Sequence, residues 1–529
     1  MKRYELIVIG AGPAGLSVAV EAANAGMSVA VFDENARPGG QLFKQIHKFF
    51  GSKEHQAKIR GFRIGQQLLK QAEEAGVEVH LNSVVMGIFD LGEITVQHGD
   101  GVCHYKGDSI LIATGACENM VPFDGWTLPG VMGAGAAQTM MNLHGVQPGS
   151  RVLMVGSGNV GLVVSFQLLQ AGVEVAAVID AAPQIGGYGV HAAKLARIGV
   201  PFYLSHTIVK AEGTDHVTGA VIAQVDESFR PIAGTEKHLD VDTVCIAVGL
   251  SPMSQLARMA GCEMTEKGGA VPVVDEYGQT SIPGLFVAGD VGGIEEASSA
   301  MIGGRIAGAA AARRSGYLPE EEFREKASAL KASLGQLHEG MFSPKNKGRR
   351  DLTVTDEGYH LSKTLLHHGY LSEEEVAGFP GAAPGKSAGI HPVIECTQNI
   401  PCNPCQDACR FGCIRVGDHM TALPAVDENA RCVGCGMCVA SCPGQAIFLV
   451  NDEEEAGTAT VTLPYEFLPV PEKGTKGVAL GRDGSVVCPA EVVEAKTAGF
   501  MDGTVLLTMR VPSEMSMKAR FFKTGEGTK

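Results

Sequence analysis

The sequence lacks a long uninterrupted apolar run. Spanning a bilayer takes roughly 18 consecutive apolar residues, and the richest stretches here, Val152–Val155 and Ser298–Ala312, are interrupted by Gly, Arg or Asn. The opening residues, MKRYELIVIGAGPAG, lead directly into a glycine loop and show no cleavage-site pattern of a secretory signal. These absences argue against a membrane span and predict a cytoplasmic protein.

Basic residues are also too few for a nucleic-acid-binding protein. The 43 Lys and Arg are outnumbered by 58 Asp and Glu, and the net charge of −15 is opposite in sign to what a phosphate backbone attracts. A hydrophobic content of 45% with 19% charged residues excludes global disorder. The length of 529 residues predicts two to four domains. No Ser/His/Asp set, metal-hydrolase motif or acid/base pair is visible, so no catalytic residue is predicted.

Glycine is abundant, and part of it forms a first nucleotide-binding pattern. A predicted strand, Glu5–Ile9, precedes a predicted helix, Leu16–Ala25. The turn between them reads G-x-G-x-x-G and consists of Gly10, Gly12, Pro13, Ala14 and Gly15. Such a turn admits a pyrophosphate at a helix N-terminus. The next predicted strand ends at Asp33 and Glu34, where a carboxylate accepts ribose hydroxyls. A merely tight turn is the alternative, and the spacing of the acids favours an adenosine site.

A second unit of the same kind is nested inside the first. The predicted strand Arg151–Val155 is followed by a turn that contains Gly156, Gly158, Asn159 and Gly161. The next strand, Glu174–Ile179, ends at Asp180, which would accept ribose hydroxyls and repel a 2′-phosphate. The sequence therefore favours NAD(H) over NADP. The alternative is an inserted domain that keeps its fold and has lost its ligand.

Two more apolar strands end in short motifs. Ser109–Gly115 reads SILIATG, and Gly284–Asp290 reads GLFVAGD before the predicted helix Ala297–Ala312. Together with the first glycine turn, these motifs make residues 1–315 resemble the FAD/NAD(P)-dependent oxidoreductases of the disulfide-reductase fold. The resemblance implies FAD in the first site. It also implies that FAD is contacted by Ala113, Thr114, Gly115, Gly289 and Asp290, the last of which binds the ribityl or pyrophosphate region in that family.

The segment after the first acidic pair is rich in glycine and then in basic residues. Arg37–Leu42 reads RPGGQL and is predicted to line the flavin through Gly40 and Gln41. The basic stretch Phe43–Arg63 is interpreted as a solvated loop. The alternative places three of its side chains at the flavin ring, namely Lys44, His47 and Lys48.

Nine of the 14 cysteines lie between residues 396 and 442. In a chain without a secretory signal this crowding predicts metal clusters rather than disulfides. The downstream run C-x-x-C-x-x-C-x-x-x-C-P is typical of a [4Fe–4S] cluster, with zinc as the alternative; it consists of Cys432, Cys435, Cys438 and Cys442. The remaining five cysteines are predicted to be buried thiols and lack the C-x-x-C spacing of a dithiol relay; they are Cys103, Cys117, Cys245, Cys262 and Cys488.

The upstream cysteines align with the downstream ones as an internal repeat, in which Cys442 falls over Cys409. One cluster is therefore predicted on Cys396, Cys402, Cys405 and Cys442, and the other on Cys409, Cys432, Cys435 and Cys438. The alternative uses Cys413 in place of Cys396 or Cys409. Residues 390–450 resemble a bacterial two-cluster ferredoxin domain, but they depart from it in the spacing at Cys396 and in lacking a Pro after Cys409.

These patterns predict an α/β fold class, with two nested Rossmann-like dinucleotide-binding domains, a small α+β ferredoxin-like domain and a C-terminal β module. The β module is interpreted as a clamp over the ferredoxin-like domain. The predicted parts are an FAD-binding domain over 1–120 that returns at 251–316, an inserted NAD(H)-binding domain over 121–250, a helical connector and linker over 317–388, the two-cluster domain over 389–452 and the β module over 453–529.

The RPGGQL loop, the segment Gly133–Gln138 and the missing C-x-x-C pair look like the α-type subunits of heteromeric amine or imino-acid dehydrogenases. That group includes sarcosine oxidase, D-hydroxyproline or proline dehydrogenase, opine oxidase and hydrogen cyanide synthase. The resemblance implies a partner flavoprotein that oxidises the substrate, a ferredoxin-like or NAD(H) acceptor and, as in some relatives, FMN between subunits. The fused two-cluster domain departs from the group. The alternatives are a self-sufficient NAD(H):ferredoxin-type oxidoreductase and a non-catalytic assembly subunit.

Overall fold

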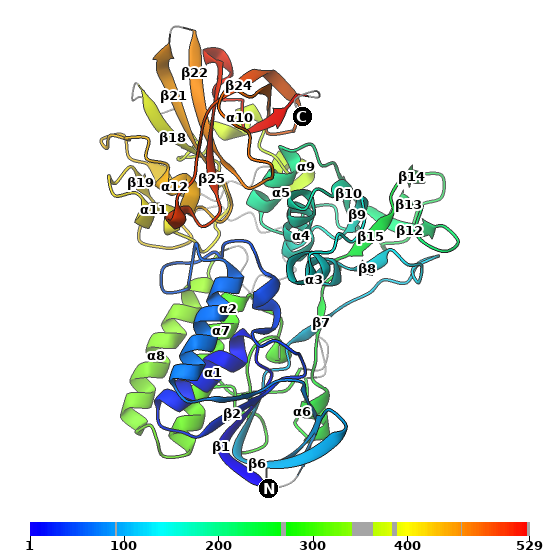
Figure 1. Cartoon of the computed structure of the whole chain (residues 1–529), viewed down its shortest axis with the longest axis vertical. Coiled ribbons are helices and arrows are strands. Elements are labelled where there is room, and N and C mark those ends of the chain that lie inside the picture. The colour runs from blue at the N-terminus through cyan, green and yellow to red at the C-terminus, as the bar shows by residue number, and fades with distance from the viewer. Residues whose placement is uncertain (90–91, 266–270, 341–362, 383–388, 456, 526–529) are drawn as a thin grey trace.

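The computed structural model describes residues 1–89, 92–265, 271–340, 363–382, 389–455 and 457–525. Figure 1 shows three lobes. The first lobe holds the N-terminus and the chain that returns after residue 250. The second lobe is the inserted segment, and the third is the C-terminal part from residue 390. None of the helices in the described ranges combines the length and the apolar character that a bilayer crossing requires.

The first lobe is built on a sheet with the order β3-β2-β1-β6-β5-β4, in which β17 also pairs with β6. Its strands are β1 (Lys2–Ile9), β2 (Val29–Phe32), β3 (Glu78–His80), β4 (Ser83–Phe89), β5 (Glu93–His98), β6 (Gly101–Ile112) and β17 (Leu285–Val287). β1 runs parallel to β2 and β6, and its second half is fully buried, as in parallel sheets covered on both faces.

Four helices of the first lobe pack together beside this sheet (Figure 1). They are α1 (Pro13–Asn24), α2 (Gly61–Glu74), α7 (Ala297–Arg314) and α8 (Glu320–Leu337). α1 begins with Pro13 directly after the N-cap Gly12, a position where the missing proline N–H costs no hydrogen bond. Small residues let α7 lie close to α1, since a Cβ on Gly304 would stand 2.5 Å from the Ala14 carbonyl oxygen. This packing fixes the start of α1 beneath the first glycine turn.

The second lobe repeats the parallel arrangement with the order β11-β10-β9-β15-β8. Its elements are β8 (Val131–Gly133), α3 (Ala134–His144), β9 (Arg151–Val155), α4 (Asn159–Gln170), β10 (Glu174–Asp180), α5 (Gly189–Ala196), β11 (Phe202–Leu204) and β15 (Thr243–Ile246). A small antiparallel sheet is attached to it, formed by β12 (His206–Glu212), β13 (Gly219–Gln224) and β14 (Lys237–Leu239). The chain enters the second lobe through β7 (Ala116–Glu118) and leaves it through β16 (Leu250–Pro252), and these two strands pair with each other. The helix α6 (Gln255–Met259) follows β16.

The third lobe is an antiparallel sheet with the order β18-β21-β22-β25-β24-β23-β26. The strands are β18 (Ile390–Ile394), β21 (Ile447–Glu455), β22 (Thr458–Tyr465), β23 (Lys476–Leu480), β24 (Val486–Lys496), β25 (Val505–Pro512) and β26 (Phe521–Thr524). β18 and β21 flank the cysteine-rich segment, so this segment and the C-terminal strands share one sheet. The boundary predicted at 452/453 falls inside β21.

The cysteine-rich segment itself carries little regular structure. It contains the short helices α11 (Pro404–Ala408) and α12 (Met437–Ser441) and the strand pair β19 (Ile414–Arg415) and β20 (Ala425–Val426). The predicted connector over 317–388 contains α8, α9 (Lys363–His368) and α10 (Glu373–Val376). Its stretches 341–362 and 383–388 lie outside the described residues.

Candidate functional site

In the first glycine turn, one glycine has open space where a Cβ would stand, and two others have backbone atoms there. A Cβ on Gly10 would stand 2.3 Å from the Ala113 oxygen, and one on Gly15 would stand 1.9 Å from the Gly10 oxygen. At Gly12, in contrast, no atom lies within 4 Å of a Cβ. The Asp33 carboxylate supports the turn by accepting the Ala11 N–H at 2.6 Å. The arrangement is a cradle at the N-terminus of α1 that suits a pyrophosphate.

Some of the other residues predicted for FAD lie against this turn. A Cβ on Gly40 would lie 2.9 Å from the Gly12 Cα, and one on Gly289 would lie 2.8 Å from the Ala14 Cβ. Asp290 begins the 3₁₀ helix η3 (Asp290–Gly292) directly after Gly289. Thr114 and Gly115 instead bond to Met253, through the Thr114 hydroxyl and the Gly115 carbonyl. The side chains of Glu34 and Gln41 are exposed.

The second glycine turn has the same geometry. Cβ atoms on Gly156 and Gly161 would stand 2.2 and 2.1 Å from backbone oxygens, whereas no atom lies within 4 Å of one on Gly158. Asp180 accepts the Ser157 N–H at 2.8 Å, as Asp33 accepts the N–H of the matching residue in the first turn. The two sites are therefore equivalent in backbone shape, and both fit a dinucleotide.

A loop over the second turn was missed in the sequence analysis. Gly187 donates its N–H to the Ser157 carbonyl at 2.9 Å, and the Tyr188 N–H donates to Asn159 Oδ1 at 2.8 Å. The Tyr188 hydroxyl reaches Glu296, just before α7, at 2.8 Å. The signal was present, because Gly186 and Gly187 follow Asp180 at the same spacing at which the PGGQL glycines follow Asp33. This loop ties the second site to the first lobe.

The upstream cysteines converge between the lobes. Burial raises the pKa of Cys396 and Cys402, and the neighbouring thiols of Cys405 and Cys442 raise it further. Cys396, Cys402 and Cys442 pack against an apolar cluster that contains Tyr188 and Val190 of the second lobe, and Phe50 of the first lobe packs against the same cluster. These four thiols are the set that the repeat predicts for one cluster, and they lie where the first and second lobes meet the third.

The downstream thiols form a second group. Burial raises the pKa of Cys438, and the thiols of Cys432, Cys409 and Cys435 raise it further. They line a cavity whose wall includes Phe411 and Val433, which are 52% and 51% exposed. Each of the two short helices carries a cysteine of one group and is followed directly by a cysteine of the other: Cys405 lies on α11 and Cys409 follows it, and Cys438 lies on α12 and Cys442 follows it.

Cys413 is a fifth thiol in the downstream cavity. Its N–H lies 3.2 Å from Cys409 Sγ. Burial raises the pKa of Cys413, and the neighbouring Cys409 raises it further.

In the described ranges no three His, Cys, Asp or Glu side chains stand close enough to hold a single metal ion; a multi-iron cluster holds its ligands farther apart. Backbone N–H groups donate to cysteine sulfurs; the Ala446 nitrogen, for example, lies 3.5 Å from Cys442 Sγ. Converging thiols with N–H donors fit iron–sulfur clusters.

The basic stretch after the PGGQL loop is not a solvated loop, so that expectation is wrong. Lys48 is 5% exposed, and its ammonium donates to the carbonyls of Ala440 and Met501 and to the Thr504 hydroxyl, at 2.6, 2.9 and 2.7 Å. Burial lowers the pKa of Lys48 to about 8, and Glu466 opposes the shift. Lys44 bonds to the Gly135 carbonyl of the second lobe at 3.1 Å.

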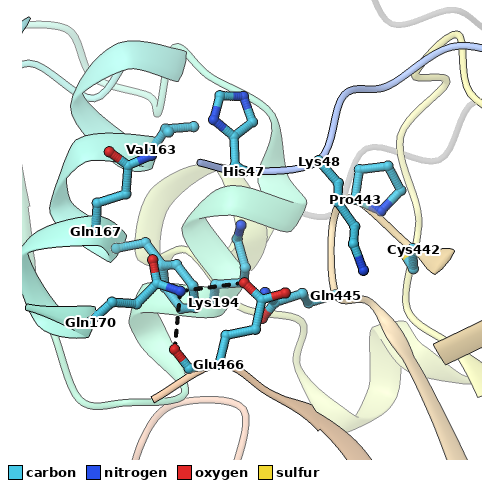
Figure 2. Close-up of a pocket in the computed structure, with 11 residues that line it drawn as sticks. His47, Lys48, Val163, Gln167, Gln170, Lys194, Cys442, Pro443, Gln445 and Glu466 are labelled. Carbon is cyan, nitrogen blue, oxygen red and sulfur yellow. Dashed lines mark hydrogen bonds between the residues drawn. The ribbon is translucent and has the colours of Figure 1, made fainter. Parts of the chain in front are cut away.

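Figure 2 shows the junction where Lys48 meets the other lobes. The cavity there is lined by residues of all three lobes, among them His47, Lys194, Cys442 and Glu466. Glu466 accepts from Arg60 at 2.9 Å and from the Gln170 amide at 3.3 Å. No local pattern could have revealed this junction, because its members are far apart in the sequence.

The scattered cysteines divide into two kinds. Cys245, Cys262 and Cys488 are buried, as expected, whereas Cys103 and Cys117 are exposed and correct the prediction. Cys103 lies in the exposed first part of β6, and Cys117 lies on β7, which joins two lobes and is only partly buried.

Comparison with known proteins agrees with this geometry. Residues 4–316 match the family described as "Pyridine nucleotide-disulphide oxidoreductase", and residues 426–448 match the "4Fe-4S binding domain". The first match covers both glycine turns, and the second covers the downstream cysteine run. They confirm the predicted α/β fold class with a ferredoxin domain and the assignment as an FAD-dependent oxidoreductase.

Two curated relatives are named as subunits of larger enzymes. The chain is 33% identical over 336 residues to a subunit of opine oxidase from Agrobacterium tumefaciens (strain Ach5), covering 58% of this chain and 65% of that protein. It is 29% identical over 371 residues to "Hydrogen cyanide synthase subunit HcnB" of Pseudomonas aeruginosa, covering 66% and 80%. The match therefore spans just under two thirds of the opine oxidase protein.

A solved structure shares the fold. Thioredoxin reductase of T. acidophilum aligns with a TM-score of 0.50 and 22% identity, over 60% of this chain and 99% of that one. With the family match over residues 4–316 and the two glycine turns in place, the chain belongs to the pyridine nucleotide-disulphide oxidoreductase family.

Proposed function

We propose that the chain is the electron-transferring subunit of a heteromeric dehydrogenase that oxidises a proline-, hydroxyproline- or sarcosine-like amino or imino acid. The observation that carries the proposal is the position of the upstream cysteines, which pack against an apolar cluster containing Tyr188 of the second lobe, a cluster against which Phe50 of the first lobe also packs. A cluster held there would touch both dinucleotide-binding lobes. The names of both curated relatives, as subunits, support a partner subunit, for which we propose a flavoprotein.

We assign FAD to the first glycine turn, NAD(H) to the second and one [4Fe–4S] cluster to each cysteine group. When bound, the flavin exchanges electrons in pairs or singly, and each cluster carries one. The exposed Phe411 and Val433 beside the downstream group offer a place where a ferredoxin-like acceptor could approach. FMN at a subunit interface follows from the family resemblance alone, and we assign no residue to it.

The two cradles give a matched pair of substitutions. Gly12→Ala should lower FAD content and leave NADH binding unchanged, and Gly158→Ala should do the reverse, because each methyl group fills space that is open only for the ligand. Overpacking of about 1–3 kcal/mol corresponds to a complex that is roughly fivefold to 150-fold weaker. Released flavin and NADH titration measure the two effects. Equal loss of both ligands in either variant would contradict the assignment.

The function is tested by anaerobic purification of the native protein with its co-purifying proteins. FAD, about eight irons per chain and a tightly held flavoprotein, together with flavin reduction on addition of an amine substrate, are expected. The second candidate is a self-sufficient NAD(H):ferredoxin-type oxidoreductase, which the open cradle at Gly158 favours. Rapid NADH turnover with an artificial one-electron acceptor and no partner would select that candidate and reject the first.

A further inference from the structure

The two cysteine groups differ in the charge that surrounds them. The cavity wall of the downstream group contains, among the described residues, cysteines, glycine and apolar side chains and no charged one. The cavity beside Cys442 of the upstream group contains Lys48, Lys194 and Glu466. Figure 2 shows both lysines projecting into the space that Cys442 and Glu466 line.

Lys194 reaches this place from the second lobe. It lies on α5 and is 2% exposed, and its ammonium stands 4.6 Å from the centre of the Phe166 ring. It interacts electrostatically with Cys442 and with Glu466. One turn further along, Arg197 donates to the Gln445 carbonyl at 2.9 Å. α5 and the residue that caps its C-terminus therefore place two buried cations on the Cys442 side of the upstream group.

Lys48 reaches the same side from the first lobe. Its ammonium donates to the carbonyl of Ala440 at 2.6 Å, and Ala440 lies two residues before Cys442 in the sequence. Lys48 also interacts electrostatically with the Cys442 thiol. Glu466 is the opposing charge, but Arg60 and the Thr504 hydroxyl already bond to it. A second carboxylate, Asp502, pairs with Arg60 at 3.6 Å. The three cations at this junction, Lys48, Lys194 and Arg60, thus outnumber its two carboxylates.

Net charge and nearby dipoles are among the factors that set the reduction potential of an iron–sulfur cluster. A thiolate-bound cluster is anionic and gains a further negative charge on reduction, so a buried cation favours the reduced form. The effect is large where the surroundings are of low polarity and water is excluded. Such cations are present on the upstream side, whereas the downstream wall offers none.

We propose that Lys194 and Lys48, one from each dinucleotide-binding lobe, raise the reduction potential of the cluster held by the upstream cysteines. The proposal rests on the assignment of two clusters under the proposed function. Both lysines act on the cluster through their charge, as positioning residues rather than catalytic ones. Each lobe that would hold a dinucleotide thereby contributes to the electron affinity of the cluster that lies between them.

The test is an EPR-monitored redox titration of the full-length protein at pH 7. Lys194→Met should lower the midpoint potential of one cluster and leave that of the other unchanged, and Lys48→Met should lower the midpoint potential of the same cluster. Lys194→Arg, which keeps the charge, should have the midpoint potential of the unsubstituted protein. Glu466→Gln, which removes the opposing charge, should raise the midpoint potential of that cluster. Lys237→Met is the matched control, because this lysine also stands 4.6 Å from an aromatic ring, that of Tyr203, but on the attached sheet of the second lobe.

Unchanged potentials in Lys194→Met, with about eight irons per chain, would overturn the proposal while leaving the proposed function intact. Shifts of the same sign in Lys194→Met and Glu466→Gln would also overturn it, because a charge effect must reverse. If Lys194→Met fails to load iron, Glu466→Gln decides by the sign of its shift. An iron count of about four in the unsubstituted protein would instead reject the two-cluster assignment itself.

Discussion

Replacing Cys435 by serine is expected to lower the iron content from about eight to about four atoms per chain and to remove one EPR signal. Cys435 lines the downstream cavity with Cys409, Cys432 and Cys438, so its loss leaves that cluster with three thiolates. The first lobe does not contribute to this cavity, and FAD content should therefore stay unchanged. Iron and sulfide analysis, with flavin release, measures both.

The control for this substitution lies in the same cavity. Cys413→Ser should retain all irons, because the repeat predicts Cys409 rather than Cys413 as the ligand. Both residues line the cavity, and the Cys413 N–H stands 3.2 Å from Cys409 Sγ. Loss of about four irons in Cys413→Ser would establish Cys413 as a ligand. Loss of FAD with full iron in Cys435→Ser would contradict the assignment of the third lobe.

Glu395→Gln should destabilise the third lobe by about 3–5 kcal/mol, the cost of leaving buried charges unpaired. Glu395 accepts from Arg520 at 2.5 Å and from Arg482 at 2.6 Å. Burial would raise its pKa, but the two guanidinium groups lower that pKa to about 2. The Arg520 side chain is fully buried, so water cannot replace the lost carboxylate.

The loss is measured as the urea concentration at which the third lobe becomes sensitive to protease, which should fall by at least about 1 M. Glu373→Gln is the matched control in the exposed pair with Lys518, whose oxygen and nitrogen are 3.1 Å apart; it should cost about 0–1 kcal/mol. Equal midpoints for the two variants would contradict the prediction. Because Glu395 precedes Cys396 directly, early loss of the upstream cluster should accompany the destabilisation.

The nucleotide sites could be predicted because their information is local. Gly10 to Gly15 and Asp33, like Gly156 to Gly161 and Asp180, lie within one strand–turn–helix–strand unit, and the structure gives both acids the same backbone bond. The cysteines carry local information of the same kind, since the internal repeat pairs α11 with α12, and the thiols of Cys405 and Cys442 on one side and of Cys438 and Cys409 on the other are neighbours in the structure. Their division into two ligand sets stays a prediction.

The junction of the lobes could not be predicted in this way. Lys48, Lys194 and Glu466 come from three lobes and belong to no periodic pattern, so the sequence indicates only that a basic stretch follows the PGGQL loop. That the third lobe forms one continuous sheet could not be predicted for a similar reason. β18 and β21 pair across more than fifty residues, and no local signal fixes such a pairing.

The third lobe also limits how the other two can move. Only the short strands β7 and β16 join the first and second lobes along the chain, a joint narrow enough to serve as a hinge. The third lobe holds both sides of it, through Lys48 and Arg60 on one side and through Gln170, Gly189 and Arg197 on the other. Swivelling about the joint would break these buried bonds. Under the proposed function, the distances between the sites assigned to FAD, NAD(H) and the two clusters would therefore be fixed by the third lobe, and electron transfer would proceed without rotation of a lobe.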